Sequence, residues 1–263
     1  AVSQSGETAD TLAALRLAKS RGALTLGIVN VVDSSIARET DAGVYIHVGP
    51  EIGVASTKAF TGHLTAFALL SVYLAQLRQA PDKTQLGYDA LREIIQLPAL
   101  VDETIRRAGE VEKIAHAYQH ASNFLYLGRG INFPVALEGA LKLKEISYIH
   151  AEGIPSAEMK HGPISLVDEN MPVLFVMASG DGTDRVLSNM AEIKARKGRI
   201  IVVAPDKEER VREYADHIIW VPRVPEWLSP FVNVVPLQLL AYHVALMRGC
   251  DVDKPRNLAK AVT

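Results

Sequence analysis

A cluster of small polar residues stands at the start of the chain, directly before a helical pattern. Ser3, Ser5 and Thr8 supply hydroxyls, Gln4 supplies an amide, and Gly6 allows a ligand to approach the backbone closely. Leucines recur at helical spacing after this cluster, so it coincides with a helix start, where unpaired N–H groups and the helix dipole attract anions. The cluster therefore predicts a phosphate cradle built from dipoles and hydroxyls. The alternative is an ordinary helix cap by Ser5 or Thr8.

Three charged residues, Glu138, Lys142 and Glu145, lie within a helical pattern that runs from about Pro134 to His150. At 100° per residue they fall at about 0°, 40° and −20°, which is one narrow stripe. Because most of the remaining surface is apolar, we expect the helix to be buried and the stripe to face a pocket or a partner. The alternative is a solvated Glu–Lys pair. Lys144 points elsewhere and is expected at the surface. The apolar positions are Leu137, Leu141, Leu143 and Ile146.

Three further segments could carry chemistry. His161, in an expected loop over 157–163, could act as an acid–base or sugar-binding group, or could simply be a histidine bonded to the backbone. Residues 53–58 form a second hydroxyl cluster at a helix start, with a helix cap as the alternative. The tail 249–263, which contains Lys260, has no periodicity and would by itself be read as frayed. The histidines are scattered, so no metal site is predicted.

The elements that must position these residues occur in two copies. The same order of elements appears twice at an offset of about 173 to 176 residues, with Gly6 matching Gly180 and Asp41 matching Asp216. Alternating strands and helices indicate doubly wound parallel sheets, so we predict two tandem α/β domains of flavodoxin-like type. The first copy reads as helix 9–21, strand 23–30, helix 34–40, strand 42–48 and a helix to about residue 78; the second reads as strand 173–178, helix 183–197, strand 199–205, helix 208–215, strand 217–221 and helix 229–248.

The second copy begins with a strand at 123–127 and the helix at 134–150, and the first copy has no counterpart of either. We therefore expect that the chain is a C-terminal fragment, or that its front end is not represented, so that the first domain lacks its opening strand and helix. Residues 81–120 read as a polar helical connector with a break at Pro98. The expected organisation is a first domain at 1–80, a connector at 81–120, a second domain at 121–248 and a tail at 249–263.

Composition narrows the class of protein. The 263 residues are 48% hydrophobic and 22% charged, with a net charge of −2, which is ordinary for a globular protein and does not indicate a nucleic-acid-binding surface. A single cysteine, Cys250, excludes a disulfide framework within the chain and fits a reducing compartment. His63, Pro236 and Gln238 interrupt the longest apolar stretches, so no membrane span is expected.

Five segments in this order closely resemble the C-terminal isomerase half of the glutamine–fructose-6-phosphate aminotransferase family, the glucosamine-6-phosphate synthases. The resemblance covers essentially the whole chain and implies two SIS (sugar isomerase) domains. The segments are 3–8, 51–60, 137–148, 160–163 and 251–260.

The resemblance implies a role for each matching position. Glu145 resembles the base that moves a proton between C1 and C2, and His161 the ring-opening histidine contributed by the neighbouring subunit of a homodimer. Lys142 and Lys260 resemble the active-site lysines, with Lys260 able to form a Schiff base with the open-chain ketose. The residues that resemble the hexose-phosphate site are Ser3, Gln4, Ser5, Thr8, Val54, Ser56 and Ala259.

The implied activity converts fructose 6-phosphate and ammonia into glucosamine 6-phosphate in the cytoplasm, without a cofactor. The family's glutaminase domain, expected upstream, is not in these residues, and Cys250 cannot replace its N-terminal nucleophile. The Gly-Thr-Ser type phosphate turn of the first SIS domain is absent as well. Two other functions stay open: a sugar-phosphate sensor without turnover, and an SIS lyase or deglycase acting on an amino-sugar phosphate.

Overall fold

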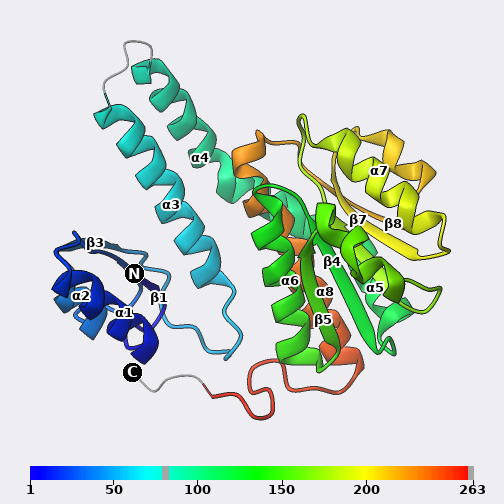
Figure 1. Ribbon diagram of the computed structural model, residues 1–263, viewed down its shortest axis with the longest axis horizontal. Helices are drawn as coiled ribbons and strands as arrows, with labels where there is room; N and C mark the ends of the chain where they lie inside the picture. The colour runs from blue at the N-terminus through cyan, green and yellow to red at the C-terminus, as the bar shows by residue number, and fades with distance from the viewer. Residues whose placement is uncertain (79–82, 260–263) are drawn as a thin grey trace. The chain divides into compact units, whose positions relative to one another are not determined.

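The computed structural model describes residues 1–78 and 83–259, with side chains described outside 79–86 (Figure 1). The chain divides into two compact units. The first contains Ala1–Ile95 and the residues from Asn257 onward, and the second contains Gln96–Arg256.

The first unit is built on a three-stranded parallel sheet of order β1-β2-β3, in which Val2 pairs with Ile28 and Leu26 with Ala42. Leu12 and Leu15 of α1 pack with Val29 and Ile36 in a small core. β1 is an edge strand in this sheet. The elements are β1 (Val2–Ser3), α1 (Ala9–Ser20), β2 (Leu26–Val29), α2 (Ser35–Glu39), β3 (Ala42–Tyr45) and α3 (Lys58–Leu77).

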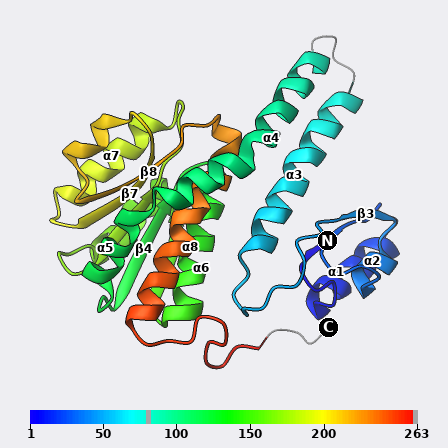
Figure 2. The same ribbon diagram turned by 180° about the vertical axis from the view of Figure 1, so that it is seen from behind.

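The second unit has a five-stranded parallel sheet of order β5-β4-β6-β7-β8. One set of alternating strand residues packs on α7, while α8 packs against α6 and α5, so both faces of the sheet are covered. Figure 2 shows α8 running alongside α6. The strands are β4 (Asn123–Gly128), β5 (His150–Pro155), β6 (Pro172–Val176), β7 (Arg199–Pro205) and β8 (His217–Val221). The helices of this unit are α5 (Gly109–Tyr118), α6 (Asn132–Ser147), α7 (Thr183–Lys194) and α8 (Ser229–Met247), with four 3-10 turns, η1 (Ser156–His161), η2 (Pro163–Leu166), η3 (Glu209–Glu213) and η4 (Glu226–Leu228). Helix α4 (Lys83–Arg106) contributes residues to both units, because the division falls between Ile95 and Gln96.

The same polar clamp recurs in the two units, in accord with the internal repeat. Asp41 accepts hydrogen bonds from the Thr25 amide at 2.9 Å and lies 3.1 Å from the Lys19 ammonium. In the second unit, the carboxylate of Asp216 accepts the Ile200 amide at 2.8 Å and a hydrogen bond from Lys194 at 3.2 Å. In each unit, a carboxylate before one strand thus fastens the start of the neighbouring strand and the end of a helix. The α/β fold with parallel sheets is confirmed.

Two local predictions are wrong. Residues around Pro98 were expected to break the connector, but α4 continues through this proline, with Leu97 and Thr104 buried on either side of it. A proline removes only one intrahelical hydrogen bond and can be accommodated where neighbouring side chains are packed.

The helix that carries the charged stripe ends at Ser147, not at His150, because Tyr148 adopts a left-handed conformation with φ 63°. Residues His150–Pro155 form β5 on the edge of the sheet, paired with β4, although Gly153 and Pro155 were expected in a loop. Gly153 is required there because a Cβ would lie 2.8 Å from the Leu137 backbone. Pro155 is tolerated because it ends an edge strand.

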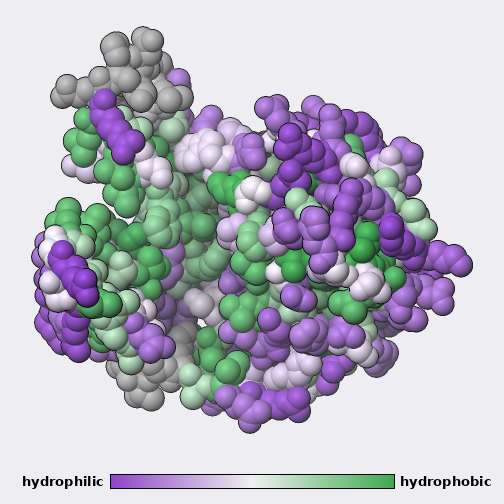
Figure 3. Space-filling view, in the orientation of Figure 1, coloured by the Kyte–Doolittle hydropathy of each residue, from purple (hydrophilic) through white to green (hydrophobic). Residues whose placement is uncertain are grey.

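Two segments are long and apolar enough to cross a membrane by length and composition alone. In Glu226–Met247, 67% of the most apolar 18-residue window is buried, as expected for a core helix. In α3, the buried share of the corresponding window is only 6%. The polar residue His63 therefore does not by itself exclude α3 as a membrane span, because α3 passes the test of length and hydropathy. In the first unit, α3 and the sheet line an apolar groove of about 880 Å³, and the surface over β3 and α3 is largely hydrophobic in Figure 3.

The Asp41 clamp makes a prediction for acid stability. Hydrogen bonds from the Thr25 backbone and side chain, followed by Lys19, lower the pKa of Asp41 from 3.8 to about 2. A depressed carboxyl pKa contributes stability above the unfolded pKa, and this contribution is lost as the pH falls through the folded pKa. We expect Asp41→Asn to destabilise the chain above about pH 4, with the difference from wild type shrinking as the pH falls toward about 2.

The measurement is denaturant unfolding followed across this pH range, with exposed Asp10→Asn as the control. A difference between Asp41→Asn and wild type that stays constant from pH 2 to pH 6 would contradict the assignment.

Candidate active site

The hydroxyl cluster at residues 3–8 forms a tight turn between β1 and α1. Ser3 is buried, its oxygen accepts the Gly6 amide at 3.0 Å, and it shares a hydrogen bond of 2.9 Å with the Thr8 hydroxyl. Thr8 occupies the N-cap position of α1 but makes no side-chain cap hydrogen bond. Ser5 accepts the Glu7 amide at 3.2 Å, and Gly6 has φ 71°. The hydroxyls of Ser3 and Thr8 thus bond within the turn. Thr8 does not cap α1, so the alternative of an ordinary helix cap does not hold for this residue.

The second hydroxyl cluster is organised by a residue that sequence reasoning missed. The Glu51 carboxylate is buried and accepts hydrogen bonds from the Ser56 hydroxyl at 2.5 Å and the Thr57 amide at 2.6 Å, at the start of α3. The alternative of a helix cap by these hydroxyls does not hold, because Thr57 at the N-cap makes no side-chain cap hydrogen bond, and Glu51 accepts the Thr57 and Ala59 amides instead. Ser56 donates its proton to this carboxylate and keeps its oxygen lone pairs as acceptors. Val54 is half-buried in the same loop.

His63 is a second residue that the sequence analysis did not select. Burial lowers the pKa of this imidazole, while a hydrogen bond with the Ser3 backbone and the charge of Glu51 oppose that shift. His63 on α3 therefore lies beside the first hydroxyl turn and near the Glu51 carboxylate of the second. The available signal was its place as a polar interruption of an apolar helix.

The charged stripe on α6 is largely removed from solvent, and its position facing a pocket or a partner stays a prediction. The Lys142 ammonium lies 2.5 Å from a Glu145 oxygen and 3.6 Å from a Glu138 oxygen, and its side chain is 5% exposed. The side chains of Glu138 and Glu145 are 11% and 23% exposed, which excludes the fully solvated alternative. Lys144 is exposed, also as predicted. The expectation that the apolar residues would all be buried is wrong for two of them, because Leu137 and Leu141 are each more than 40% exposed.

The helix end that follows the stripe also holds the start of the C-terminal tail. The Tyr148 hydroxyl accepts the Arg256 amide at 2.8 Å, and the Arg256 guanidinium lies 4.2 Å from the centre of the tyrosine ring. A cation–π contact and a hydrogen bond thus fix the tail 108 residues away along the chain. Ala259 is exposed, and Lys260 lies outside the described residues.

His161 lies at the end of η1, not in an irregular loop, and its side chain is exposed just before Gly162, whose φ is 137°. Among the described residues, no hydrogen bond or ion pair joins it to the stripe on α6. The described residues contain no group of three or more metal-ligating side chains. The predicted residues therefore fall into two sets. Those of the first unit are Ser3, Gln4, Ser5, Thr8, Val54, Ser56 and Ala259, and those of the second are Lys142, Glu145 and His161.

If the turn at residues 3–8 binds the phosphate of a sugar phosphate, Thr8→Val should weaken binding by roughly 1.5–3 kcal/mol, the range for hydrogen bonds to charged groups. Valine keeps the shape but removes a hydroxyl that also contacts Ser3. Calorimetric titration with fructose 6-phosphate measures the effect. Thr61→Val on α3, whose hydroxyl donates to the Lys58 carbonyl, is the control. Affinity equal to wild type in Thr8→Val would contradict the cradle.

Comparison with known proteins agrees with the fold and with the arrangement of these segments. The SIS domain family matches residues 1–73 and 117–248. The chain is 54% identical over 263 residues to the glutamine–fructose-6-phosphate aminotransferase [isomerizing] of Bacteroides thetaiotaomicron, covering all of this chain and 43% of that protein. The chain thus spans less than half the length of the curated relatives that it matches.

Two solved structures are similar over nearly the whole chain. The C-terminal domain of glucosamine-fructose-6-phosphate aminotransferase from Francisella tularensis is 42% identical, with a TM-score of 0.91 over 97% of this chain and 72% of that one. The glucosamine-6-phosphate deaminase from Thermotoga maritima is 27% identical, with a TM-score of 0.78 over 99% of this chain and 73% of that one.

Proposed function

Because the chain belongs to the family of SIS-domain proteins, we propose that it is the sugar-phosphate isomerase half of a glutamine–fructose-6-phosphate aminotransferase. It would convert fructose 6-phosphate and ammonia into glucosamine 6-phosphate. The observation that carries the proposal is the buried Lys142, held 2.5 Å from Glu145 on one face of α6. Burying an ammonium beside two carboxylates costs free energy of folding, because the charges lose their hydration. A site with little water is, however, an environment in which a carboxylate can transfer a proton to or from carbon.

The proposed chemistry follows from these groups. The amine of Lys260 adds to the C2 carbonyl of the open-chain ketose and water leaves; ammonia then adds to this imine carbon and the Lys260 amine leaves, which gives the C2 imine of the sugar. The Glu145 carboxylate takes a proton from C1 and returns it to C2, while the C1 hydroxyl proton passes to the nitrogen, so the product is an aldose with an amine on C2. Lys142 orients this carboxylate and stabilises the negative charge that develops during the transfer. The phosphate, bound at residues 3–8, would use remote binding energy to orient the reacting end.

The test is formation of glucosamine 6-phosphate from fructose 6-phosphate by the purified chain, with either ammonium or glutamine as nitrogen donor. Product is expected with ammonium and not with glutamine, because these 263 residues carry one cysteine, Cys250, which does not stand at an N-terminus. Borohydride added with fructose 6-phosphate should trap an adduct that peptide mass mapping assigns to Lys260 and that disappears in Lys260→Arg. Product from glutamine, or a bound sugar without any adduct in the tail, would contradict these roles.

A second candidate is the reverse chemistry, release of ammonia from an amino-sugar phosphate, favoured by the similarity to a structure named as a glucosamine-6-phosphate deaminase. The same proton shuttle would serve either direction. Measuring ammonia release from glucosamine 6-phosphate under the same conditions discriminates the two. Release faster than synthesis at equal substrate concentration would favour the deaminase.

We also propose that the protein is a homodimer in which His161 completes the site of the partner subunit, and that it works in the cytoplasm with a glutaminase domain upstream. The support is an exposed histidine with no contact to the α6 stripe in the described structure.

We expect His161→Ala and Glu145→Gln, each inactive alone, to regain about a quarter of wild-type activity after subunit exchange, because a random mixture is about half mixed dimers, each with one intact site. Activity is measured after exchange has been verified with differently tagged subunits. Exchange without recovery would contradict the shared site.

Fractionation of the source cells tests the proposed compartment. Recovery of the protein in the membrane fraction would contradict a cytoplasmic location.

A further inference from the structure

The second unit has a cavity of about 420 Å³ at the carboxyl ends of three neighbouring strands. β4 ends at Gly128, β5 at Pro155 and β6 at Val176, and all three residues line it. Because β5 and β6 lie on opposite sides of β4, this is the point where the strand order reverses. Open parallel sheets bind ligands in the crevice at such a point. The cavity shares no residue with the α6 stripe.

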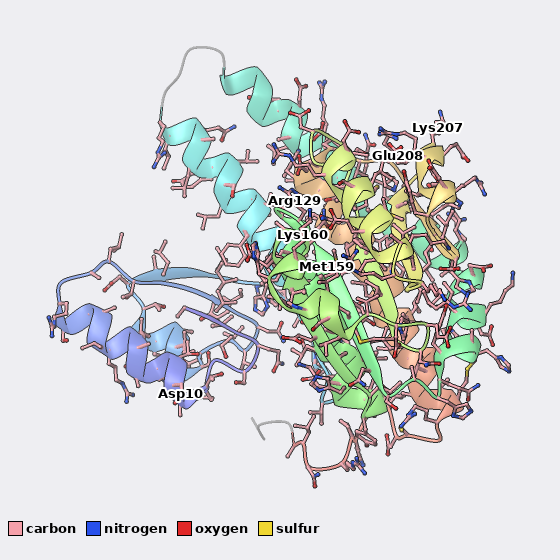
Figure 4. All side chains as sticks on the ribbon, turned by 45° about the vertical axis from the view of Figure 1, so that its right-hand side comes forward. Asp10, Arg129, Met159, Lys160, Lys207 and Glu208 are labelled. Carbon is pink, nitrogen blue, oxygen red and sulfur yellow. The ribbon has the colours of Figure 1, made fainter. Side chains whose placement is uncertain are left out.

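One wall of the cavity carries an arginine without a partner. Arg129, labelled in Figure 4, is half-buried, and the described residues offer its guanidinium neither an ion pair nor a hydrogen bond. Its side chain lies against Gly182, where a Cβ would come 3.9 Å from the Arg129 Cδ. Gly182 is the N-cap of α7, so the cationic side chain and the positive end of a twelve-residue helix lie together. This combination attracts an anion such as a phosphate.

A carboxylate lines the same cavity. The Glu226 oxygens approach the backbone closely, 3.1 Å from the position of a Cβ on Gly180 and 3.8 Å from one on Gly130. Gly180 and Gly130 have φ of 134° and 54°, so side chains at both positions would be strained, and at Gly180 a side chain would also crowd Glu226. No ion pair joins Glu226 to Arg129 or to another cation of the described chain. The cavity therefore presents an unpaired guanidinium and an unpaired carboxylate that do not neutralise each other.

We propose that this cavity binds a phosphorylated amino sugar, with the phosphate at Arg129 and the start of α7 and the ammonium at Glu226. A ligand that carries both charges satisfies both groups, whereas a plain sugar phosphate leaves the carboxylate unpaired near its own negative charge. The volume lies within the range of small-molecule sites. The cavity wall includes Ser179, whose hydroxyl is buried without a hydrogen-bond partner. The ligand class is that of the product of the proposed reaction, so the product would bind at a second place, in the repeat that does not carry the 3–8 turn.

The experiment is calorimetric titration of the chain with glucosamine 6-phosphate and with glucose 6-phosphate, in a Ser5→Ala, Thr8→Val background that disables the first unit's turn. We expect residual binding of glucosamine 6-phosphate that Arg129→Gln weakens by roughly 10- to 100-fold, because charge-assisted hydrogen bonds to the phosphate are lost. Glu226→Gln should remove the preference for the amino sugar over glucose 6-phosphate. Arg185→Gln, an exposed arginine on α7, is the control and should change affinity less than twofold.

Three results would overturn the proposal: no residual binding in the background variant, equal binding in Arg129→Gln, or glucose 6-phosphate binding as tightly as the amino sugar. Circular dichroism of each variant verifies that it folds, and Glu226→Gln tests the site independently of Arg129. The outcome is separable from the catalytic assignment, because neither Arg129 nor Glu226 belongs to the proposed catalytic groups. Glu145→Gln can therefore lose turnover whether or not the Arg129–Glu226 cavity binds the amino-sugar phosphate.

Discussion

Replacing Glu145 with Gln is expected to lower the rate of glucosamine 6-phosphate formation by roughly 10²- to 10⁴-fold, the usual contribution of a positioned general base. The carboxylate is held 2.5 Å from the Lys142 ammonium in a largely buried stripe. Glutamine preserves the size of the side chain and a hydrogen-bond acceptor but cannot take a proton from carbon. The loss should therefore appear in kcat, while the affinity for fructose 6-phosphate changes little.

Steady-state kinetics with saturating ammonium separates these effects. Glu152→Gln, an exposed residue of β5, is the matched control and should keep wild-type activity. A tenfold or smaller loss in kcat would show that Glu145 does not carry the proton. A large loss confined to KM would instead assign it to substrate binding.

Replacing Lys142 with Met is expected to destabilise the folded chain by about 3–5 kcal/mol, the typical effect of breaking a buried ion pair. The ammonium is 5% exposed and lies near two carboxylates, at 2.5 Å and 3.6 Å. Methionine fills similar space but leaves Glu138 and Glu145 facing each other without the cation between them. The cost comes from the carboxylates that lose this cation, and not from the missing lysine itself.

Urea unfolding of Lys142→Met and of Lys144→Met measures the effect. Lys144 is exposed on the same helix, so its replacement should change stability by no more than about 0.5 kcal/mol. Adding Glu145→Gln to Lys142→Met should recover part of the loss, because one uncompensated charge is removed. A loss below about 1 kcal/mol in Lys142→Met, or no recovery in the double variant, would mean that the carboxylates are solvated in solution.

Several features of the candidate site follow from local sequence. The alignment of Glu138, Lys142 and Glu145 on one face depends only on helical periodicity and was predicted correctly. The same holds for the turn at residues 3–8 before α1 and for the outward direction of Lys144. The internal repeat also matched Asp41 with Asp216, and the structure shows these two carboxylates in equivalent clamps. Helix faces and turns can be predicted from the sequence because they depend on residues within a few positions of one another.

Other features required the tertiary structure. Burial of Lys142 instead of solvation, the Glu51 cap of α3 and the closeness of His63 to Ser3 depend on how separate elements pack. The strand β5 was missed because its Gly153 and Pro155 resemble a loop, and only pairing with β4 makes it a strand.

The order and type of most elements, the charged stripe and the family resemblance can therefore be predicted from local patterns of residues. The packing of the elements determines which polar groups lose water and which distant residues meet, such as Tyr148 and Arg256, 108 positions apart. The physical reason is that secondary-structure periodicity is set by local backbone geometry, whereas burial and long-range hydrogen bonds arise only when the elements pack together.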